Sequence, residues 1–218
     1  DRIRHRMRQG WLHQIGPNAF RLPGTDSTPQ ARLFGLLLDV GAPVWAFGPT
    51  AAALHRFDGF DLGPPFHLVV PRGRQVRRVG SSIHTSQHLP HDDCTEIAGI
   101  RVLRPARTLI DLGRIVDRAV LTRAYDAAVR DRLVNEDALI HRVLGLLDRS
   151  CHRLGAEELL AVINGSEIER GAHSFLERRF LRLMDEHDLP RPETQHVAGW
   201  SNDRLIRVDF RFPGTNVV

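Results

Sequence analysis

The sequence has no lysine, so all 30 of its basic residues are arginine. Against 26 acidic residues, this gives a formal net charge of only +4. A lysine-free composition fits a GC-rich genome and indicates little about chemistry. The distribution of the arginines is more informative, because nucleic-acid binding requires positive charge gathered on one surface. Arginines cluster at residues 2–8 and at residues 72–78.

Cysteines and long apolar runs are also scarce. The two cysteines, Cys94 and Cys151, are far apart in the sequence and indicate neither a disulfide framework nor a zinc clip. No apolar run is long enough for a transmembrane helix, and no signal peptide is recognisable. We therefore expect no membrane contact and a cytoplasmic location. No phosphate-cradling glycine motif is present, so the motifs do not indicate a nucleotide cofactor.

The first 22 residues predict a short helix, a glycine stop and a small two-stranded ribbon. Ile3 and Met7 are four residues apart, so they share one helix face that can pack on a core. Gly10 is typical of the position just past a helix C-terminus. Residues 11–15 and 19–22 then predict two strands, joined by a Gly-Pro-Asn turn at 16–18.

The polar surface of this helix is almost entirely cationic. Its side chains include Arg2, Arg4, His5, Arg6 and Arg8, which suit contacts with phosphates and base edges. A helix, a turn and a ribbon in this order are typical of the recognition helix and wing of a winged helix-turn-helix, with double-stranded DNA as partner. We expect Arg4, His5 and Arg8 to reach base edges. Arg2, Arg6 and Arg21 of the ribbon would hold phosphates. The alternative is a solvated surface helix without a DNA role.

Residues 1–22 resemble the end of the N-terminal winged-helix domain of AbiEi-type antitoxins from type IV toxin–antitoxin systems. In that family, two or three helices precede the recognition helix, whereas this chain starts at Asp1 without them. We therefore expect a chain truncated at its N-terminus. The resemblance implies a transcriptional autorepressor that binds inverted repeats upstream of its operon and has a cognate toxin. A homodimer is expected, because paired half-sites commonly raise affinity.

Residues 28–164 predict a small mixed α/β core followed by helices. The apolar run at 66–70 predicts a buried strand, and further short strands are predicted at 81–85, 95–97 and 99–103. Thr28, Asp117 and Asn135 are predicted N-caps, and Pro105 occupies a predicted first helical position. An Asn-Gly-Ser sequence at 164–166 breaks the helical pattern and predicts a domain boundary.

Residues 71–80 of this region predict a basic loop with Arg72, Arg74, Arg77 and Arg78. These arginines indicate either a second DNA contact or a solvated loop. The stretches 48–60, 66–73 and 98–113 resemble recurrent blocks of the AbiEi family. This second resemblance implies an α/β core that supports DNA binding or dimer contacts.

A dense group of potential metal ligands follows the basic loop. It comprises His84, His88, His91, Asp92, Asp93 and Cys94. The spacing could bind a transition metal if it lay on one helix, but Pro90 and the neighbouring Ser and Thr residues favour a strand and a loop. We therefore expect these side chains to be mainly solvated.

The C-terminal residues predict a second kind of chemistry. Residues 172–187 predict an amphipathic helix with Glu177, and residues 205–212 an alternating strand with Asp209 on its polar face. This order resembles the start of a PD-(D/E)xK nuclease core like that of the very-short-patch-repair endonuclease. The resemblance implies that Asp209 is the first metal-binding carboxylate and Glu177 a further catalytic acid. Such carboxylates hold Mg²⁺ for phosphodiester hydrolysis.

Structural alternatives exist for both acids: Glu177 could cap its helix, and Asp209 could pair with Arg207 or Arg211. The chain stops at Val218, where the next nuclease strand would begin. We therefore expect truncation at this end too, an incomplete metal site and no activity of the fragment.

The expected fold class is α/β (α+β), in three parts. Residues 1–24 would be the end of a winged helix-turn-helix, and residues 28–164 an AbiEi-like α/β core with a helical region. Residues 168–218 would be a truncated, restriction-endonuclease-like α/β domain. The expected function is a DNA-binding regulator, and the alternative is a Mg²⁺-dependent DNA endonuclease that the winged helix delivers to its substrate.

Overall fold

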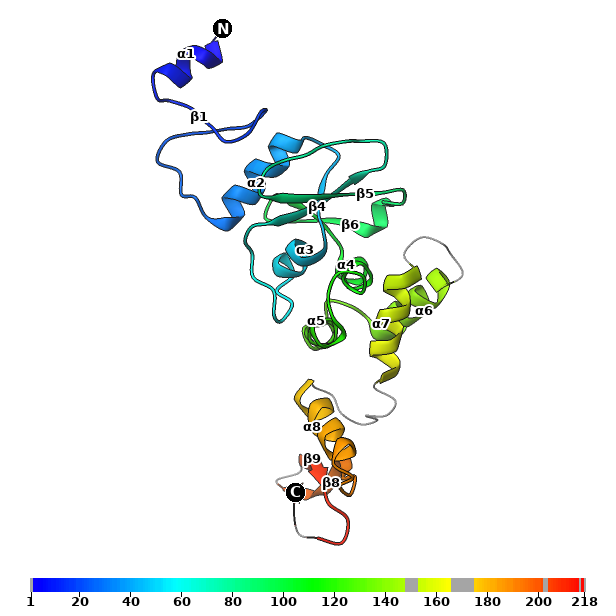
Figure 1. Ribbon diagram of the computed structural model, residues 1–218. Coiled ribbons are helices and arrows are strands. Elements are labelled where there is room, and N and C mark those ends of the chain that lie inside the picture. The colour runs from blue at the N-terminus through cyan, green and yellow to red at the C-terminus, as the bar shows by residue number, and fades with distance from the viewer. Residues whose placement is uncertain (1, 148–152, 166–174, 202–203, 216, 218) are drawn as a thin grey trace.

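The computed structural model describes residues 2–147, 153–165, 175–201, 204–215 and 217 (Figure 1). The chain begins with helix α1 (Arg2–Arg8) and a ribbon of two short strands, β1 (His13–Gln14) and β2 (Phe20–Arg21). The strands are antiparallel, with His13 opposite Arg21. The predicted helix and ribbon are confirmed, although each strand is shorter than the sequence pattern predicted.

The core contains a mixed five-stranded sheet in the order β5-β4-β3-β7-β6. Its strands are β3 (Trp45–Ala46), β4 (Phe66–Pro71), β5 (Ser81–Ser86), β6 (Cys94–Ile97) and β7 (Ile100–Leu103). The β4–β5 and β3–β7 pairs are parallel, whereas β3–β4 and β6–β7 are antiparallel. All four strands predicted within residues 66–103 are confirmed, and so is the α+β class.

Helix α2 (Pro29–Val40) covers part of this sheet. Thr28 caps it as predicted, because its side chain accepts a hydrogen bond from the Ala31 N–H at 3.1 Å. Leu33, Leu37 and Val40 of α2 form one buried cluster with Phe66, Leu68 and Val70 of β4. The alternation of these three β4 residues places them on one face of the sheet.

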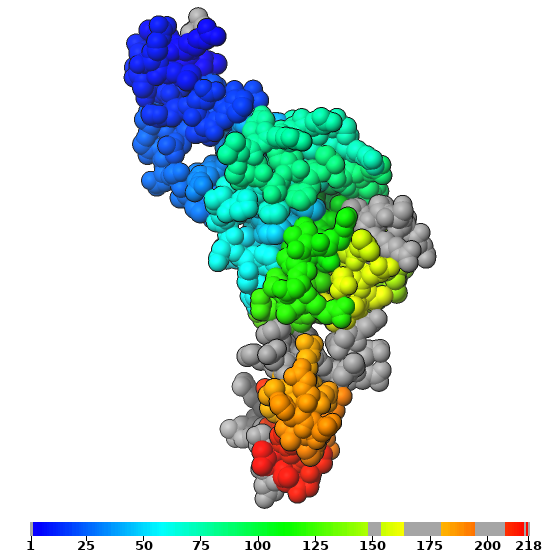
Figure 2. All heavy atoms as spheres, in the orientation of Figure 1, coloured from blue at the N-terminus to red at the C-terminus, as the bar shows by residue number. Residues whose placement is uncertain are grey.

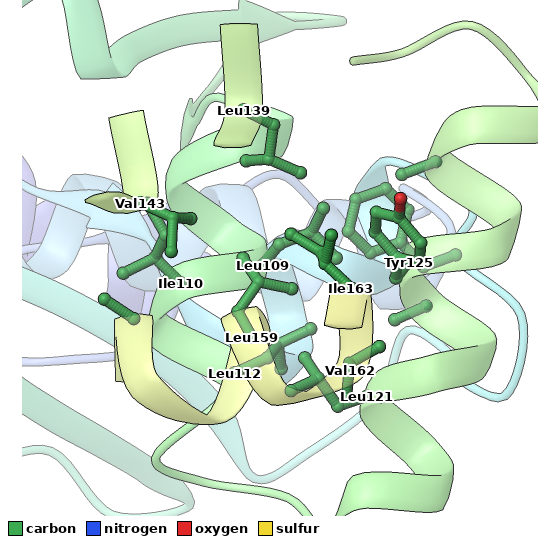
Figure 3. Close-up of a cluster of buried hydrophobic side chains, with 14 of the residues drawn as sticks. Leu109, Ile110, Leu112, Leu121, Tyr125, Leu139, Val143, Leu159, Val162 and Ile163 are labelled. Atoms are coloured by element: carbon green, nitrogen blue, oxygen red, sulfur yellow. The ribbon is translucent and has the colours of Figure 1, made fainter. Parts of the chain in front are cut away.

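A helical layer forms the second and larger buried cluster (Figure 3). Its helices are α3 (Gly48–Leu54), α4 (Pro105–Leu112), α5 (Arg118–Arg130), α6 (Glu136–Leu147) and α7 (Arg153–Gly165). The predicted caps are confirmed: Asp117 accepts the Val120 N–H at 2.8 Å, and Asn135 accepts the Ala138 N–H at 2.9 Å. Helix α7 continues to Gly165, and the rest of the predicted boundary lies outside the described residues.

The C-terminal part contains α8 (Phe175–Glu186) and an antiparallel hairpin, β8 (Glu193–Ser201) and β9 (Arg204–Arg211). Leu181 and Met184 are buried, and the Phe180 and Phe210 rings pack with their centroids 4.7 Å apart. The predicted helix and strand are confirmed, while the predicted turn at 202–203 lies outside the described residues. In the part of the chain that the structure describes, no helix combines the length and apolarity needed to cross a bilayer.

Candidate nucleic-acid interface

Helix α1 presents its cationic side chains to solvent, and the N-terminal residues project from one end of the molecule (Figure 2). The exposed side chains are Arg2, Arg4, His5, Arg6 and Arg8. The helix ends in a Schellman motif, in which the Gly10 N–H donates to the Met7 carbonyl (3.0 Å) and the Trp11 N–H to the Arg6 carbonyl (2.9 Å). Gly10 has a φ of 74°, which only glycine adopts without strain. The predicted glycine stop is therefore confirmed.

The apolar pair of α1 does not anchor it among the described residues. Ile3 is 49% exposed, Met7 is only half-buried, and α1 has no buried residue. The prediction that this pair packs on a core is therefore wrong for the described chain. The physical reason is that the ribbon, which follows α1 in the chain, does not cover the apolar face of α1. The ribbon packs on α2 instead. The side chain of Ile15 lies against Gly35, where an added Cβ would be 2.5 Å from Ile15 Cδ1.

The ribbon is attached to the core by one buried acid on α2. Asp39 is 3% exposed, and its carboxylate accepts the Asn18 N–H at 2.5 Å and a hydrogen bond from Arg78 Nε. Its carbonyl accepts Asn18 Nδ2 and Arg78 Nη2 at 3.1 and 3.0 Å. A Cβ at Gly16 would lie 2.3 Å from the Asp39 carboxyl carbon, so glycine is required there. We call these four residues the Asp39 junction; it joins the ribbon, α2 and the basic loop.

Sequence reasoning missed Asp39. One signal was available, because an acid in the last turn of a helix opposes the helix dipole. Such an acid is retained at low free-energy cost only when a cation or hydrogen-bond donors compensate it. Arg78 and Asn18 supply that compensation from two distant segments, and Gly16 leaves room for the carboxylate.

The basic loop divides into structural and exposed arginines. Arg74 donates to the carbonyls of Gly41 and Pro43 at 2.7 and 3.0 Å, just past the end of α2. Arg78 belongs to the Asp39 junction. Both side chains therefore compensate the negative end of α2. Arg72 and Arg77 are exposed. Of the four arginines predicted as a second DNA contact, two thus have a structural task and two face solvent.

The two candidate catalytic acids lie apart from this interface, in the C-terminal part. Asp209 is exposed on β9, and Glu177 lies on α8 with its side chain outside the described residues. On the same hairpin, Arg211 forms an ion pair with Glu193 at 3.4 Å. Across the described ranges, no three His, Cys, Asp or Glu side chains form a group that could hold a metal ion. The magnesium site therefore stays a sequence-based prediction.

A buried ion network lies within the core, under the loop with the potential metal ligands. Arg107 of α4 is 1% exposed and donates to Asp111 at 2.8 Å and to Asp93 at 2.9 Å. Arg142 of α6 forms an ion pair with the other carboxylate oxygen of Asp93. Asp93 ends a short 3₁₀ helix, η1 (His91–Asp93), and is 1% exposed. The expectation that this group is mainly solvated is therefore wrong for Asp93, because a buried guanidinium compensates its charge.

Two histidines meet on the neighbouring strands β4 and β5. His67 Nδ1 and His84 Nε2 are 3.3 Å apart, and the rings stack at an interplanar angle of 15°. Burial lowers the pKa of both imidazoles; the charge on His84 adds to this at His67, while nearby Asp111 opposes it at His84. Burial also lowers the pKa of His55, whose Nε2 donates to the Leu103 carbonyl at 2.7 Å. All three side chains therefore favour the neutral form in the folded protein.

Thermal stability should therefore fall between pH 7.5 and pH 5.5. These histidines have folded-state pKa values below the unfolded value near 6.5, so the unfolded chain binds more protons as the pH falls through that value. The contribution of the neutral histidines to the free energy of unfolding is fully present above the pKa of the unfolded state. It is lost as the pH falls toward their lower pKa in the folded state. The Tm of the protein and of His84→Gln should be measured across this range. The variant should show the shallower dependence, and equal slopes would contradict the assignment.

The observed geometry defines the class: an α+β protein with a mixed five-stranded core that carries a cationic helix and ribbon at its N-terminal side. Residues 41–162 match the family model of the AbiEi antitoxin C-terminal domain. The chain belongs to this family. The match runs from just before β3 into α7, so α1, the ribbon and the C-terminal hairpin lie outside it.

Two proteins of Mycobacterium tuberculosis, from two strains and both described as uncharacterized, are similar to this chain. Each is 28% identical over 182 residues, which are 84% of this chain and 64% of the relative. The chain thus spans somewhat less than two thirds of the length of these relatives. Their names assign no activity.

Proposed function

We propose that this protein is a DNA-binding regulator of the antitoxin type, which represses its own operon by binding upstream DNA with α1 and the adjoining ribbon. The observation that carries the proposal is the joint exposure of five cationic side chains on α1, next to a ribbon held on α2. Arginine and histidine at successive helix positions can contact both phosphates and base edges.

The roles within this surface follow from position and exposure. Arg4, His5 and Arg8 are assigned to base edges in the major groove, and Arg2 and Arg6 to phosphates. Exposed Arg72 is assigned to a phosphate outside the half-site. Arg21 and Arg77 line a groove between the ribbon and the core. The Asp39 junction supplies the positioning, because it bonds the turn of the ribbon to α2.

Two partners belong to this proposal besides DNA. A cognate toxin would bind the family-matched core, since family membership supports an antitoxin role. A second copy of the chain would occupy the other half of an inverted repeat, because dimers bind two half-sites about one helical turn apart. No second function is proposed from Asp209 and Glu177. Asp209 is exposed on a two-stranded hairpin, and the side chain of Glu177 lies outside the described residues.

The test is fluorescence anisotropy with DNA from upstream of the protein's own gene, against a scrambled duplex, over a salt series. Arg4→Ala should weaken binding to the upstream DNA by about tenfold or more, as expected for the loss of one base contact. The matched control is Arg118→Ala on α5: Arg118 is 59% exposed and pairs with Glu158, and α5 lies across the core from α1 (Figure 1).

The outcomes separate sequence reading from general charge attraction. The control variant should bind DNA nearly as tightly as the wild type. Only a small loss of affinity is expected, because the variant carries one positive charge fewer. Equal affinity for both duplexes, with a steep salt dependence, would contradict a sequence-reading regulator. Equal effects of Arg4→Ala and Arg118→Ala would contradict the assignment of α1 as the reading element.

A further inference from the structure

A groove separates the ribbon from the core, beside the Asp39 junction. Its volume is about 580 Å³, within the range of small-molecule sites. Its walls come from four segments of the chain: the ribbon, the linker and α2 between residues 26 and 39, residues 64 and 66 at the start of β4, and the end of the basic loop at residues 77–80. Tertiary packing alone creates it, which explains why no ligand motif appears in the sequence.

The charges in the groove favour an anion. Four arginines line it, Arg21, Arg32, Arg77 and Arg78, against the two acids Asp26 and Asp39. Arg78 and Asp39 compensate each other in the junction. Three arginines then face one aspartate, which leaves a surplus of two positive charges. Arg21 Nε is buried and has no hydrogen-bond partner among the described residues. A buried donor without an acceptor costs free energy.

The remaining walls are mostly apolar. Ile15, Leu36, Pro64, Phe66 and Val79 line the groove beside the arginines. Val79 is fully exposed and Ile15 is 47% exposed, although both are apolar. Arginine forks match phosphate oxygens in a bidentate manner, and apolar walls favour a ring or chain attached to the phosphate. This combination fits an organic phosphate better than a bare inorganic anion.

We propose that this groove binds a small organic phosphate of mononucleotide size. Arg21, Arg32 and Arg77 hold the phosphate, and Leu36 and Phe66 contact the apolar part. The ligand touches both the ribbon and the core, so it binds the docked ribbon more tightly than a detached one and stabilises docking by linkage. The site does not depend on operator recognition by α1, so it can be tested separately from the proposed function.

The test is calorimetric titration of the 218-residue chain with three probes. AMP carries a phosphate and a flat aromatic ring system, adenosine lacks the phosphate, and inorganic phosphate lacks the ring. AMP should bind at least tenfold more tightly than either of the others. If adenosine binds as tightly as AMP, the groove is not an anion site. If inorganic phosphate binds as tightly as AMP, the organic part of the ligand does not contribute to binding.

Variants then locate the site. Arg77→Ala and Arg32→Ala should each weaken AMP binding by about tenfold, as expected for the loss of a charge-assisted contact. Arg72→Ala is the matched control, because Arg72 is exposed in the same loop but does not line the groove. An equal effect of Arg72→Ala would overturn the site.

The same phosphate chemistry could come from the DNA backbone, and a competition arm distinguishes the two sources. AMP should remain bound when upstream duplex is added, and Arg4→Ala should leave AMP affinity unchanged. Displacement of AMP by duplex would show that the groove holds a backbone phosphate and would overturn a separate small-molecule site. If the wild-type chain binds AMP but does not bind the upstream DNA, only the proposed function as a DNA-binding regulator is contradicted.

Discussion

Replacement of Arg107 by methionine should lower the free energy of unfolding by about 3–5 kcal/mol, the usual cost of removing one partner from a buried ion pair. The Arg107 side chain donates to Asp93 and Asp111, which are only 1% and 4% exposed. Methionine is unbranched and replaces the apolar stem of the side chain, but it leaves both carboxylates without this donor. Asp93 retains Arg142, whereas the Asp111 bond to Arg107 Nε is lost.

The matched control is Arg130→Met on α5. Arg130 also contacts two aspartates, Asp58 at 2.7 Å and Asp131 at 2.9 Å, but its side chain is 56% exposed. Water screens such pairs, so the variant should lose no more than about 1 kcal/mol. Urea unfolding of both variants measures the difference. Equal losses would contradict the view that burial, rather than the number of ion pairs, decides the energy.

Gly155→Ala should also destabilise the protein, by about 3 kcal/mol, as expected for an overpacked core position. An added Cβ at Gly155 of α7 would lie 2.0 Å from the Ile110 carbonyl oxygen of α4. That neighbour is backbone, so α4 and α7 would have to separate. At the same crossing, a Cβ at Gly113 would lie 2.5 Å from the Gly155 carbonyl oxygen. The clash outweighs the higher helix propensity of alanine, which is worth about 1 kcal/mol.

Gly145→Ala provides the opposite case. Gly145 lies within α6, is exposed, and an added Cβ would meet no atom within 4 Å. The substitution should therefore stabilise the protein by about 0.5–1 kcal/mol through helix propensity alone. The two Gly→Ala variants should shift the urea midpoint in opposite directions. A shift of Gly155→Ala toward higher urea would show that the α4–α7 crossing is not tight in solution.

Local structure was largely predictable. Thr28, Asp117 and Asn135 begin helices because their side chains satisfy N–H groups only three residues away. Gly10 ends α1 because few other residues adopt its φ. The strands within 66–103 were predicted because short apolar or β-branched runs bounded by turn residues are typical of strands. Each of these signals lies within a few residues of the feature it determines.

The candidate interface was predictable only in its outermost part. The cationic face of α1 is readable because all of its charges lie on one helix. The separate roles of the arginines in the basic loop could not be predicted from the sequence, because all four are the same residue type. These are Arg72, Arg74, Arg77 and Arg78. Their roles differ only because the end of α2 lies beside the loop and binds Arg74 and Arg78. The exposed Ile3 was mispredicted for the same reason: periodicity indicates an apolar face but not what covers it.

The sequence by itself determined the helices, the strands, the caps and the placement of positive charge, because these depend on contacts between residues close in the chain. Tertiary structure decided three other features: which arginines are structural, how Asp39 joins the ribbon to the core, and where the Arg21-lined groove lies. These depend on pairs such as Asn18 with Asp39, or Arg107 with Asp93, in which neither residue shows from its own neighbours that a partner exists. Long-range packing supplies that partner, and burial then gives the contact its energy.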